Sequence, residues 1–351
     1  MRRTVLVSGA IFAFVVAGAV LNYAHAPAVA TFVVTGIALA GVAWTIGVAT
    51  ESVGARYGPG VTGALQSTLG NLPELFIVLF ALAAGELVVA QYSILGSIFA
   101  NALLVLGLAI SVGALRAPRG VMTFSHRLPM DTATLLILAV FLIALLGVSN
   151  QAGDAASDNA MAISVVGALL LLAVYGIWIW GYLRSDERAE PALEEPAYEA
   201  LPFGFSVGLL AASGIAAAFV SEWFVHAIDP AVEALGISKA FTGLVIVAIA
   251  GNAVENVVAV QLAAKRKYDL AVSVVKNSVV QIACFLWPIL VLASLLFAER
   301  LSFVVSPIFV GALLVMALAL WQITGDGEAT PFEGVALVAL YVVLATIVWF
   351  E

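Results

Sequence analysis

The sequence has little charge and almost no cysteine. Asp, Glu, Lys and Arg make up 10% of its 351 residues, whereas hydrophobic side chains make up 63%. Soluble globular chains carry about a quarter charged residues, so this composition excludes an ordinary soluble protein. The single cysteine, Cys284, excludes disulfide bonds within the chain and cysteine-rich metal sites. The sequence also lacks a basic arm or a basic–aromatic pattern, so we expect no nucleic-acid partner.

What the sequence does contain is a series of apolar runs, each long enough to cross a lipid bilayer. We predict an all-α polytopic membrane protein with about eleven transmembrane helices. The expected spans are 4–23, 29–50, 60–84, 88–113, 130–149, 159–183, 203–227, 238–264, 270–297, 302–323 and 331–350.

The first apolar run follows two arginines and precedes Ala-His-Ala, a pattern that cleaved signal peptides also show. Because the run is long for a signal peptide, we interpret it as a retained helix. Basic residues predict the orientation. With a cytoplasmic N-terminus, eleven of the fourteen Lys and Arg residues fall at cytoplasmic positions, the exceptions being Lys239, Lys276 and Arg300. We interpret the compact chain as a multi-pass protein of a prokaryotic plasma membrane.

A short motif occurs twice. Residues 70–74 are Gly-Asn-Leu-Pro-Glu and residues 251–255 are Gly-Asn-Ala-Val-Glu. The glutamate that ends each motif lies 23 residues before a serine, Ser97 or Ser278. The motifs predict two copies of a five-helix unit, and an odd number of helices inverts the second copy in the membrane. Inverted repeats with broken helices are typical of transporters with a site near the membrane midplane.

The repeat predicts the organisation of the chain. Residues 1–28 form an extra N-terminal helix, residues 29–183 the first repeat and residues 203–351 the second repeat. The acidic stretch 184–202 between them is expected to be a cytoplasmic linker.

Glu74 and Glu255, the glutamates of the two motifs, are the leading candidates for function. A carboxylate at this depth costs several kcal/mol, so it must face protein, water or an ion. Two converging carboxylates repel each other unless a cation lies between them or one of them takes a proton. This alternation is itself a mechanism for exchanging a cation for protons.

The neighbouring side chains favour a hard cation such as Ca²⁺, which binds six to eight oxygen atoms. Asn71 and Asn252 lie one helical turn before the glutamates, and Gly70 and Gly251 permit a break that exposes backbone carbonyls. A second polar set can complete the coordination: Ser97, Asn101, Ser278 and Gln281. The first two are four residues apart and the last two are three apart, so each pair lies on one face of a helix. The alternative for this set is hydrogen bonding between helices.

Glu51 and Glu222 lie at or near predicted helix ends. We consider them candidates for a gate or a proton path near the two mouths. The alternative for Glu51 is an interfacial residue without a transport role.

The stretches 70–82, 91–107 and 251–291 resemble the two repeats of the cation/proton exchanger family of Ca²⁺/H⁺ antiporters, within the cation/Ca²⁺ exchanger superfamily. The resemblance covers both halves and the acidic linker. It implies eleven helices, alternating access around a central site, and Glu74 and Glu255 as the acids that bind cation and protons. It also implies that the polar set and the two asparagines form the pocket.

Three short stretches depart from the family pattern. Asn256 stands where the family usually has His, and Leu72-Pro73 where Ala is common. Lys276 and Asn277 replace an apolar residue and Gly before Ser278. Three roles for Lys276 stay open: it pairs with a carboxylate, it extends to the membrane surface, or it lowers the affinity for a divalent cation.

The sequence therefore predicts a secondary Ca²⁺/H⁺ antiporter that needs no cofactor, with Ca²⁺, H⁺ and the lipid bilayer as its partners. Exchange of Na⁺ or K⁺ for protons, and Na⁺/Ca²⁺ exchange, are the alternatives. An intramembrane enzyme is disfavoured because no HExxH motif, Ser-His pair or phosphate loop is present. The sequence makes no prediction of oligomeric state.

Overall fold

A computed structural model describes residues 2–54, 56–57, 65, 68–125, 127–184 and 201–350. The apolar runs form helices because a backbone inside a bilayer must satisfy its own hydrogen bonds. The helices are α1 (Arg2–Tyr23), α2 (Ala28–Gly54), α4 (Leu72–Ala83), α5 (Leu87–Phe99), α6 (Leu106–Arg116), α7 (Arg127–Ala152), α8 (Ala160–Arg184), α9 (Phe203–Leu235), α10 (Lys239–Phe241), α11 (Ala248–Gly251), α12 (Ala253–Ala264), α13 (Tyr268–Gln281), α14 (Trp287–Ser294), α15 (Pro307–Thr324) and α16 (Pro331–Trp349).

Within the described residues, three short π-helical segments and one 3-10 turn interrupt or join these helices. They are η1 (Ala100–Val105), η2 (Ser157–Asn159), η4 (Thr242–Val247) and η5 (Ile282–Leu286). A two-stranded antiparallel sheet pairs β1 (Met122–Thr123) with β2 (Glu328–Ala329), with Met122 opposite Ala329.

The prediction of a helical membrane protein is confirmed. Within the described residues, nine helices are long and apolar enough to cross a membrane, and ten if residues 239–264 count as one broken span. The predicted count of eleven is not reached there, since the expected span 60–84 overlaps residues outside the described ranges. Most of the acidic linker, 184–202, also lies outside them.

The chain forms two compact units, and each unit draws on both halves of the sequence. The first unit contains residues 1–96, 179–254 and 348–351, and the second contains residues 97–178 and 255–347. These units do not correspond to the predicted repeats, since each contains residues of both repeats. The predicted division into an extra helix, two repeats and a linker therefore stays a prediction.

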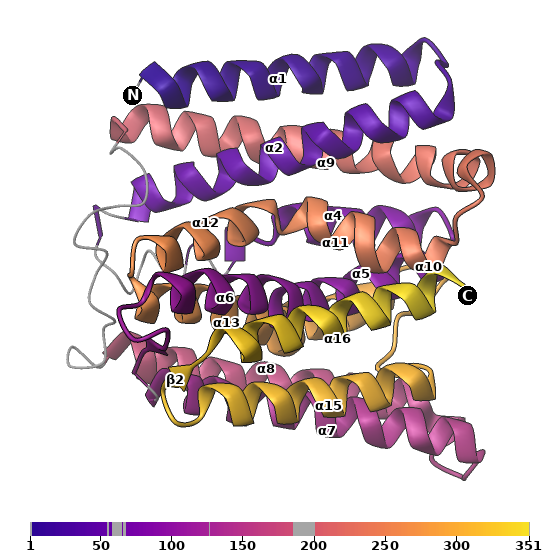
Figure 1. Ribbon diagram of the computed structural model, residues 1–351. Helices are drawn as coiled ribbons and strands as arrows, with labels where there is room; N and C mark the ends of the chain where they lie inside the picture. Colours follow the sequence, from indigo (N-terminus) through magenta and orange to yellow (C-terminus); the bar gives the residue numbers. More distant parts are fainter. Residues whose placement is uncertain are drawn as a thin grey trace. The chain divides into compact units, whose positions relative to one another are not determined.

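In the first unit, α1, α2 and α9 pack side by side (Figure 1). The core between α2 and α9 contains Val42, Ile46, Ala216 and Ala217. Small alanines allow close approach of membrane helices. The rings of Phe32 and Phe224 stack with centroids 4.9 Å apart.

Helix α9 is longer than the predicted span 203–227, because it continues through Pro230 to Leu235. An internal proline costs a helix about 3 kcal/mol. Burial of Ala231 and Val232 directly after the proline offsets this cost. As a result, Glu222 lies well inside α9, and the prediction that it lies near a helix end is wrong.

Contacts at one end of the first unit join three segments. Lys239 Nζ lies 2.7 Å from Glu86 Oε2 and 2.6 Å from Asp229 Oδ1. Ser238 Oγ donates a hydrogen bond to the Val348 carbonyl at 3.0 Å. The turn between α4 and α5, the turn between α9 and α10, and the end of α16 therefore share one end of this unit.

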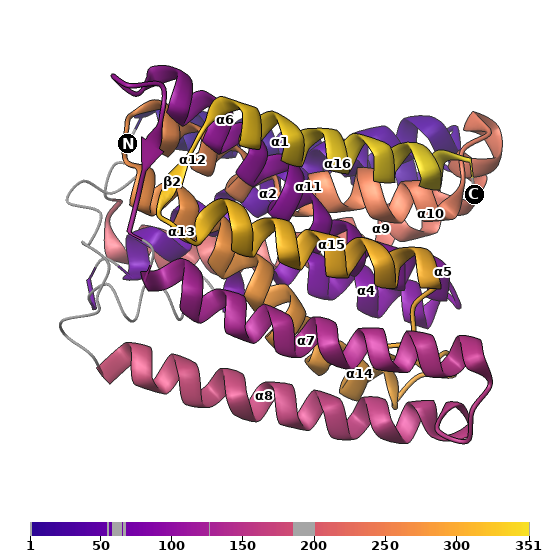
Figure 2. The same cartoon turned by 60° about the horizontal axis from the view of Figure 1, so that its bottom comes forward.

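In the second unit, α7 and α15 lie side by side (Figures 1 and 2). The strands β1 and β2 join the loop after α6 to the loop after α15. Ser125 N donates a hydrogen bond to Asp269 Oδ1 at 2.6 Å, and Arg116 Nη1 donates to the Ala264 carbonyl at 3.1 Å. Three loops of the second unit, after α6, α12 and α15, therefore lie at one end.

Candidate functional site

The first motif forms the predicted helix break. Asn71 has φ −91° and ψ 13°, outside the regular helix, and α4 begins at Leu72. Pro73 fits the first turn of α4 because its missing N–H has no partner to lose there. Glu74 also lies in this first turn, where the helix dipole favours negative charge. Asn71 and Glu74 are both 4% exposed, so the break carries a buried amide and a buried acid.

The carboxyl group of Glu74 lies against the second motif. A Cβ atom built on Gly251 would lie 2.6 Å from Glu74 Oε1 and 2.9 Å from its carboxyl carbon. Both residues belong to the first unit, in which α4 contacts α11. The absence of a side chain at Gly251 therefore leaves room for the Glu74 carboxylate.

The second motif breaks its helix in the same conformation as the first. Asn252 has φ −96° and ψ 23°, close to the angles of Asn71, and separates α11 from α12. Its side-chain Nδ2 donates a hydrogen bond to the Ala248 carbonyl at 2.9 Å. Glu255 lies in the first turn of α12 and is half-buried. Each motif therefore puts its glutamate at the start of a new helix.

The second polar set lies in the second unit, where α13 packs against η1. Ser97, Asn101 and Ser278 are all buried, and Gln281 is half-buried. Asn101 Nδ2 donates a hydrogen bond to the Ser97 carbonyl at 3.0 Å, as Asn252 does to the residue four before it. Ser278 Oγ is buried and has no hydrogen-bond partner among the described residues. A buried hydroxyl in this state retains its capacity to bind a ligand.

The two π-helical segments of this unit occur at corresponding positions. Asn101 lies in η1, and Gln281 immediately precedes η5. The two segments start at Ala100 and Ile282, a separation of 182 residues, and the two motif glutamates are 181 residues apart. π-Helical turns are rare and occur frequently at functional sites. The sequence does not predict them, because a π turn leaves no pattern in residue type.

These side chains offer oxygen ligands of three kinds: carboxylate, amide and hydroxyl. Among the described residues, no group of three or more His, Cys, Asp or Glu side chains is arranged to hold a metal ion. A cation bound at either glutamate would therefore need amide, hydroxyl or backbone oxygens beside the carboxylate. Such a donor set fits hard cations, which prefer oxygen.

A family model described as sodium/calcium exchanger protein matches residues 27–183 and 205–350. This chain belongs to the sodium/calcium exchanger family. The Ca²⁺/H⁺ antiporter ChaA of Bacillus subtilis is 34% identical over 337 residues, which cover 94% of each chain. A Ca²⁺/H⁺ antiporter of Aphanothece halophytica is 31% identical over 347 residues, covering 94% of this chain and 92% of the relative. A solved structure of the Ca²⁺/H⁺ antiporter protein YfkE has a TM-score of 0.80 and 28% identity, and both chains are covered completely, 100% each.

These comparisons confirm the family predicted from the two motifs. Membership in the sodium/calcium exchanger family makes this chain a transporter and a multi-pass membrane protein. The roles of the individual candidate residues stay predictions.

Asn277 is a further candidate that was not predicted as a site residue, although it departs from the family pattern. Its Oδ1 atom is buried and has no hydrogen-bond partner among the described residues. It directly precedes Ser278 on α13. In this member of the exchanger family, two adjacent side chains thus present oxygen atoms that remain open to a ligand.

Glu51 and Glu222 belong to the first unit, in which α2 packs along α9. Glu51 is 8% exposed and lies in the last turn of α2. Glu222 is half-buried within α9. The burial of Glu51 argues against the interfacial alternative for that residue.

Lys276 points away from the polar set. It precedes Ser278 by two residues on α13, a rotation of about 200° around a helix. Its Nζ donates a hydrogen bond to Thr324 Oγ1 at 2.6 Å, at the end of α15. Lys276 is 4% exposed, so its side chain is buried within the second unit.

Proposed function

We propose that this chain exchanges Ca²⁺ for protons across a membrane. The observation that carries the proposal is the full-length likeness to Ca²⁺/H⁺ antiporters, at 31% to 34% identity over more than nine-tenths of each chain. The acids of the two helix breaks, Glu74 buried and Glu255 half-buried, give this likeness a chemical basis. As a transporter, the protein would leave its substrates chemically unchanged, so we do not expect an enzyme, and we expect no cofactor.

In this proposal Glu74 and Glu255 bind either the cation or protons. A Ca²⁺ ion needs the carboxylates ionised, whereas its departure leaves buried negative charge that protons neutralise. Competition of the two ions for the same oxygens couples their movements. We keep the prediction that both glutamates serve one central ion as part of this proposal.

The amides and hydroxyls complete the coordination in the same scheme. Two of these amides, Asn71 and Asn252, lie at the helix breaks. The other four side chains lie within or shortly before the π-helical segments η1 and η5: Ser97, Asn101, Ser278 and Gln281. We add Asn277 to this set because its Oδ1 is buried and open. Glu51 and Glu222 serve as the proton path or gate.

Alternating access by two inverted repeats is the mechanism that we infer. Equal spacing of the motifs and the matched conformations of Asn71 and Asn252 support two related copies. The family model also matches two separate stretches, 27–183 and 205–350, which agree with the predicted repeats.

A cytoplasmic N-terminus is also part of the proposal. Within each unit, loops that the topology assigns to the same side of the membrane are joined by hydrogen bonds, ion pairs or strand pairing. The bias of Lys and Arg toward the even-numbered loops gives the sign of the orientation.

Proton flux in everted vesicles tests the transported ion. An imposed pH gradient is followed by a fluorescent probe while Ca²⁺, Na⁺ or K⁺ is added in turn. The proposal expects Ca²⁺ to dissipate the gradient, and vesicles without the protein serve as the control. If only Na⁺ or K⁺ dissipates the gradient, the transported cation is monovalent and not Ca²⁺. If none of the three ions dissipates it, the proposal is contradicted.

A further inference from the structure

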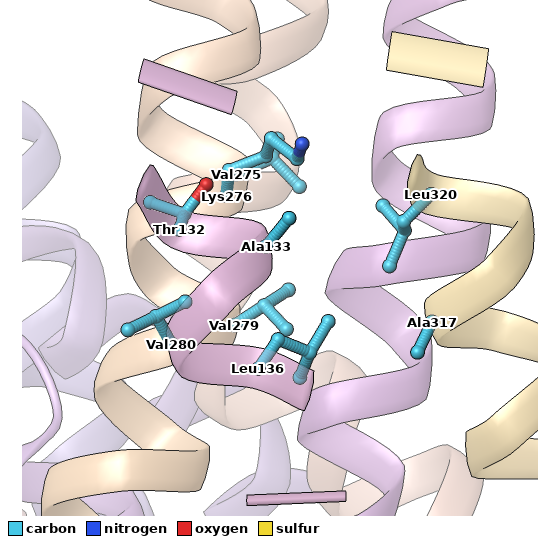
Figure 3. Close-up of a pocket in the computed structure, with 9 residues that line it drawn as sticks. All are labelled: Thr132, Ala133, Leu136, Val275, Lys276, Val279, Val280, Ala317 and Leu320. Atoms are coloured by element: carbon cyan, nitrogen blue, oxygen red, sulfur yellow. The ribbon is translucent and has the colours of Figure 1, made fainter. Parts of the chain in front are cut away.

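The buried side chain of Lys276 lies in a narrow crevice of the second unit (Figure 3). The crevice is lined by residues of α7, α13 and α15 and has a volume of about 10 Å³, room for about one water molecule. Of the nine lining side chains, only Lys276 and Thr132 carry a nitrogen or oxygen atom. An amine in such apolar surroundings needs a physical explanation, because burial of an ionisable group is costly.

Hydrogen bonding indicates how Lys276 is accommodated. Thr324 Oγ1 accepts a hydrogen bond from Lys276 Nζ at 2.6 Å. The same hydroxyl donates its own proton to the Leu320 carbonyl, also at 2.6 Å. The hydroxyl proton is thus used, and Lys276 must act as the donor, which suits an ammonium group.

The helix that carries Thr324 favours a positive charge at this point. Helix α15 ends at Thr324, and the last turn of a helix carries the negative end of its dipole. Lys276 Nζ therefore contacts the one end of α15 that stabilises a cation. Both the hydrogen-bond pattern and the dipole favour the protonated form of Lys276.

Lys276 is also close in sequence to the candidate ligands. Asn277 and Ser278 follow it directly on α13, and two residues span about 3 Å along a helix axis. Charges interact over longer distances in protein than in water, because the effective dielectric constant is lower. A charge at Lys276 therefore acts on any cation that binds the ligand face of α13.

We propose that Lys276 is a specificity-determining residue: a positive charge, held at the C-terminal end of α15 through Thr324, that weakens binding of highly charged cations. This inference rests on the proposed function of the site. Lys276 does not touch the ion in this account. Its charge penalises a cation in proportion to the charge of that cation, so trivalent ions are affected most and monovalent ions least.

Substitution of Lys276 separates the charge from the packing. Lys276→Met keeps a long unbranched side chain without the charge, and Lys276→Arg keeps the charge. We expect Lys276→Met to lower the apparent KM for Ca²⁺ by about threefold to tenfold, from the removal of one nearby charge. Inhibition of Ca²⁺ transport by La³⁺ should strengthen by a larger factor, and Lys276→Arg should resemble the wild type.

A purely structural role for Lys276 would give a different result. Loosened packing of α13 against α15 would lower kcat or thermal stability without favouring ions of higher charge. The inference is overturned if Lys276→Met leaves the KM for Ca²⁺ and the La³⁺ inhibition unchanged. It is also overturned if the Met and Arg variants behave alike.

A second pair of variants serves if Lys276→Met does not fold. Thr324→Glu keeps Lys276 and adds a carboxylate at its contact, so it should shift ion affinity in the same direction as Lys276→Met. Thr324→Gln is the uncharged control. Equal affinities of these two variants would contradict the inference.

Binding of Tb³⁺ to the purified protein, measured by Tb³⁺ luminescence, distinguishes a failure of the proposed function from a failure of the inference on Lys276. If wild-type vesicles do not move Ca²⁺, the proposed function fails, while Tb³⁺ affinity still tests Lys276. If Ca²⁺ is transported but Tb³⁺ affinity does not depend on the charge at Lys276, only this inference fails.

Discussion

The position of the Glu74 carboxylate depends on the missing side chain at Gly251. The carboxyl group occupies the space in which any other residue would carry its Cβ atom. The second copy of the motif therefore has a physical reason to begin with glycine. The need at this position is for close approach, since Gly251 belongs to helix α11.

We expect Gly251→Ala to reduce Ca²⁺-dependent proton flux by roughly tenfold or more, which corresponds to a loss of about 1.4 kcal/mol in ion binding. The added methyl group displaces the Glu74 carboxylate from the break. Gly208→Ala in α9 is the matched control, because nothing lies within 4 Å of a Cβ atom there. Equal flux in both variants would show that the contact with Gly251 has no role in transport.

At the scale of single residues, sequence reasoning found the acids but not their contacts. The repeat of the motif identified Glu74 and Glu255, because helix packing alone gives no reason for two acids to recur at equal spacing in apolar runs. The contact between Gly251 and Glu74 joins residues far apart in the chain, and no local pattern encodes it. The partner of Lys276 on α15 was not predicted for the same reason.

At the scale of elements, the π-helical segment η4, which precedes the second break, crosses α5 at two glycines. Gly96 belongs to α5 and Gly243 to η4. A Cβ atom on Gly96 would overlap the Leu244 carbonyl, and one on Gly243 would lie 3.0 Å from Tyr92 Cβ. All four residues belong to the first unit. Contact between backbones at this crossing fixes η4, and through it α11 and Asn252.

Gly96→Ala should therefore destabilise the protein by about 1–3 kcal/mol or more, the usual cost of forcing extra atoms into a packed core. The measurement is the thermal unfolding midpoint of the purified protein in detergent. Gly176→Ala in α8 adds the same methyl group where nothing lies within 4 Å, and should leave the midpoint unchanged or slightly raised. A midpoint for Gly96→Ala equal to that of the control would refute the close crossing.

The elements also show where sequence patterns fail. The apolar run predicted an end of the seventh span near residue 227, but tertiary burial of Ala231 and Val232 extends α9 to Leu235. Long apolar runs, by contrast, predicted α1, α2, α7, α8, α15 and α16 well, because length and hydrophobicity alone determine a membrane span.

At the scale of the whole molecule, both compact units mix segments from the two halves of the chain. The predicted repeats therefore do not coincide with the two compact units. The first unit takes α2 and α4 from one half and α9 and α11 from the other. A repeat can be read from spacing, whereas this mixing depends on packing that spacing does not encode.

The proposed topology predicts which loops face the outside. In a Cys284→Ala background, Ala155→Cys should react with an impermeant maleimide on intact cells, and Arg119→Cys should react only after permeabilisation. Both positions are exposed, and α7 lies between them. The opposite labelling would invert the orientation, and labelling of both from one side would contradict α7 as a single crossing.

The central claim is that Glu74 and Glu255 carry both Ca²⁺ and protons, and proton release on Ca²⁺ binding tests it most directly. Purified protein in weakly buffered detergent solution is titrated with Ca²⁺ while the pH is recorded. We predict proton release from the wild type and from Glu233→Gln, an exposed control on α9. Glu74→Gln and Glu255→Gln should each release fewer protons, because an amide cannot take part in the exchange. Undiminished release from both variants, or Ca²⁺ binding by the wild type without any release, would contradict the account.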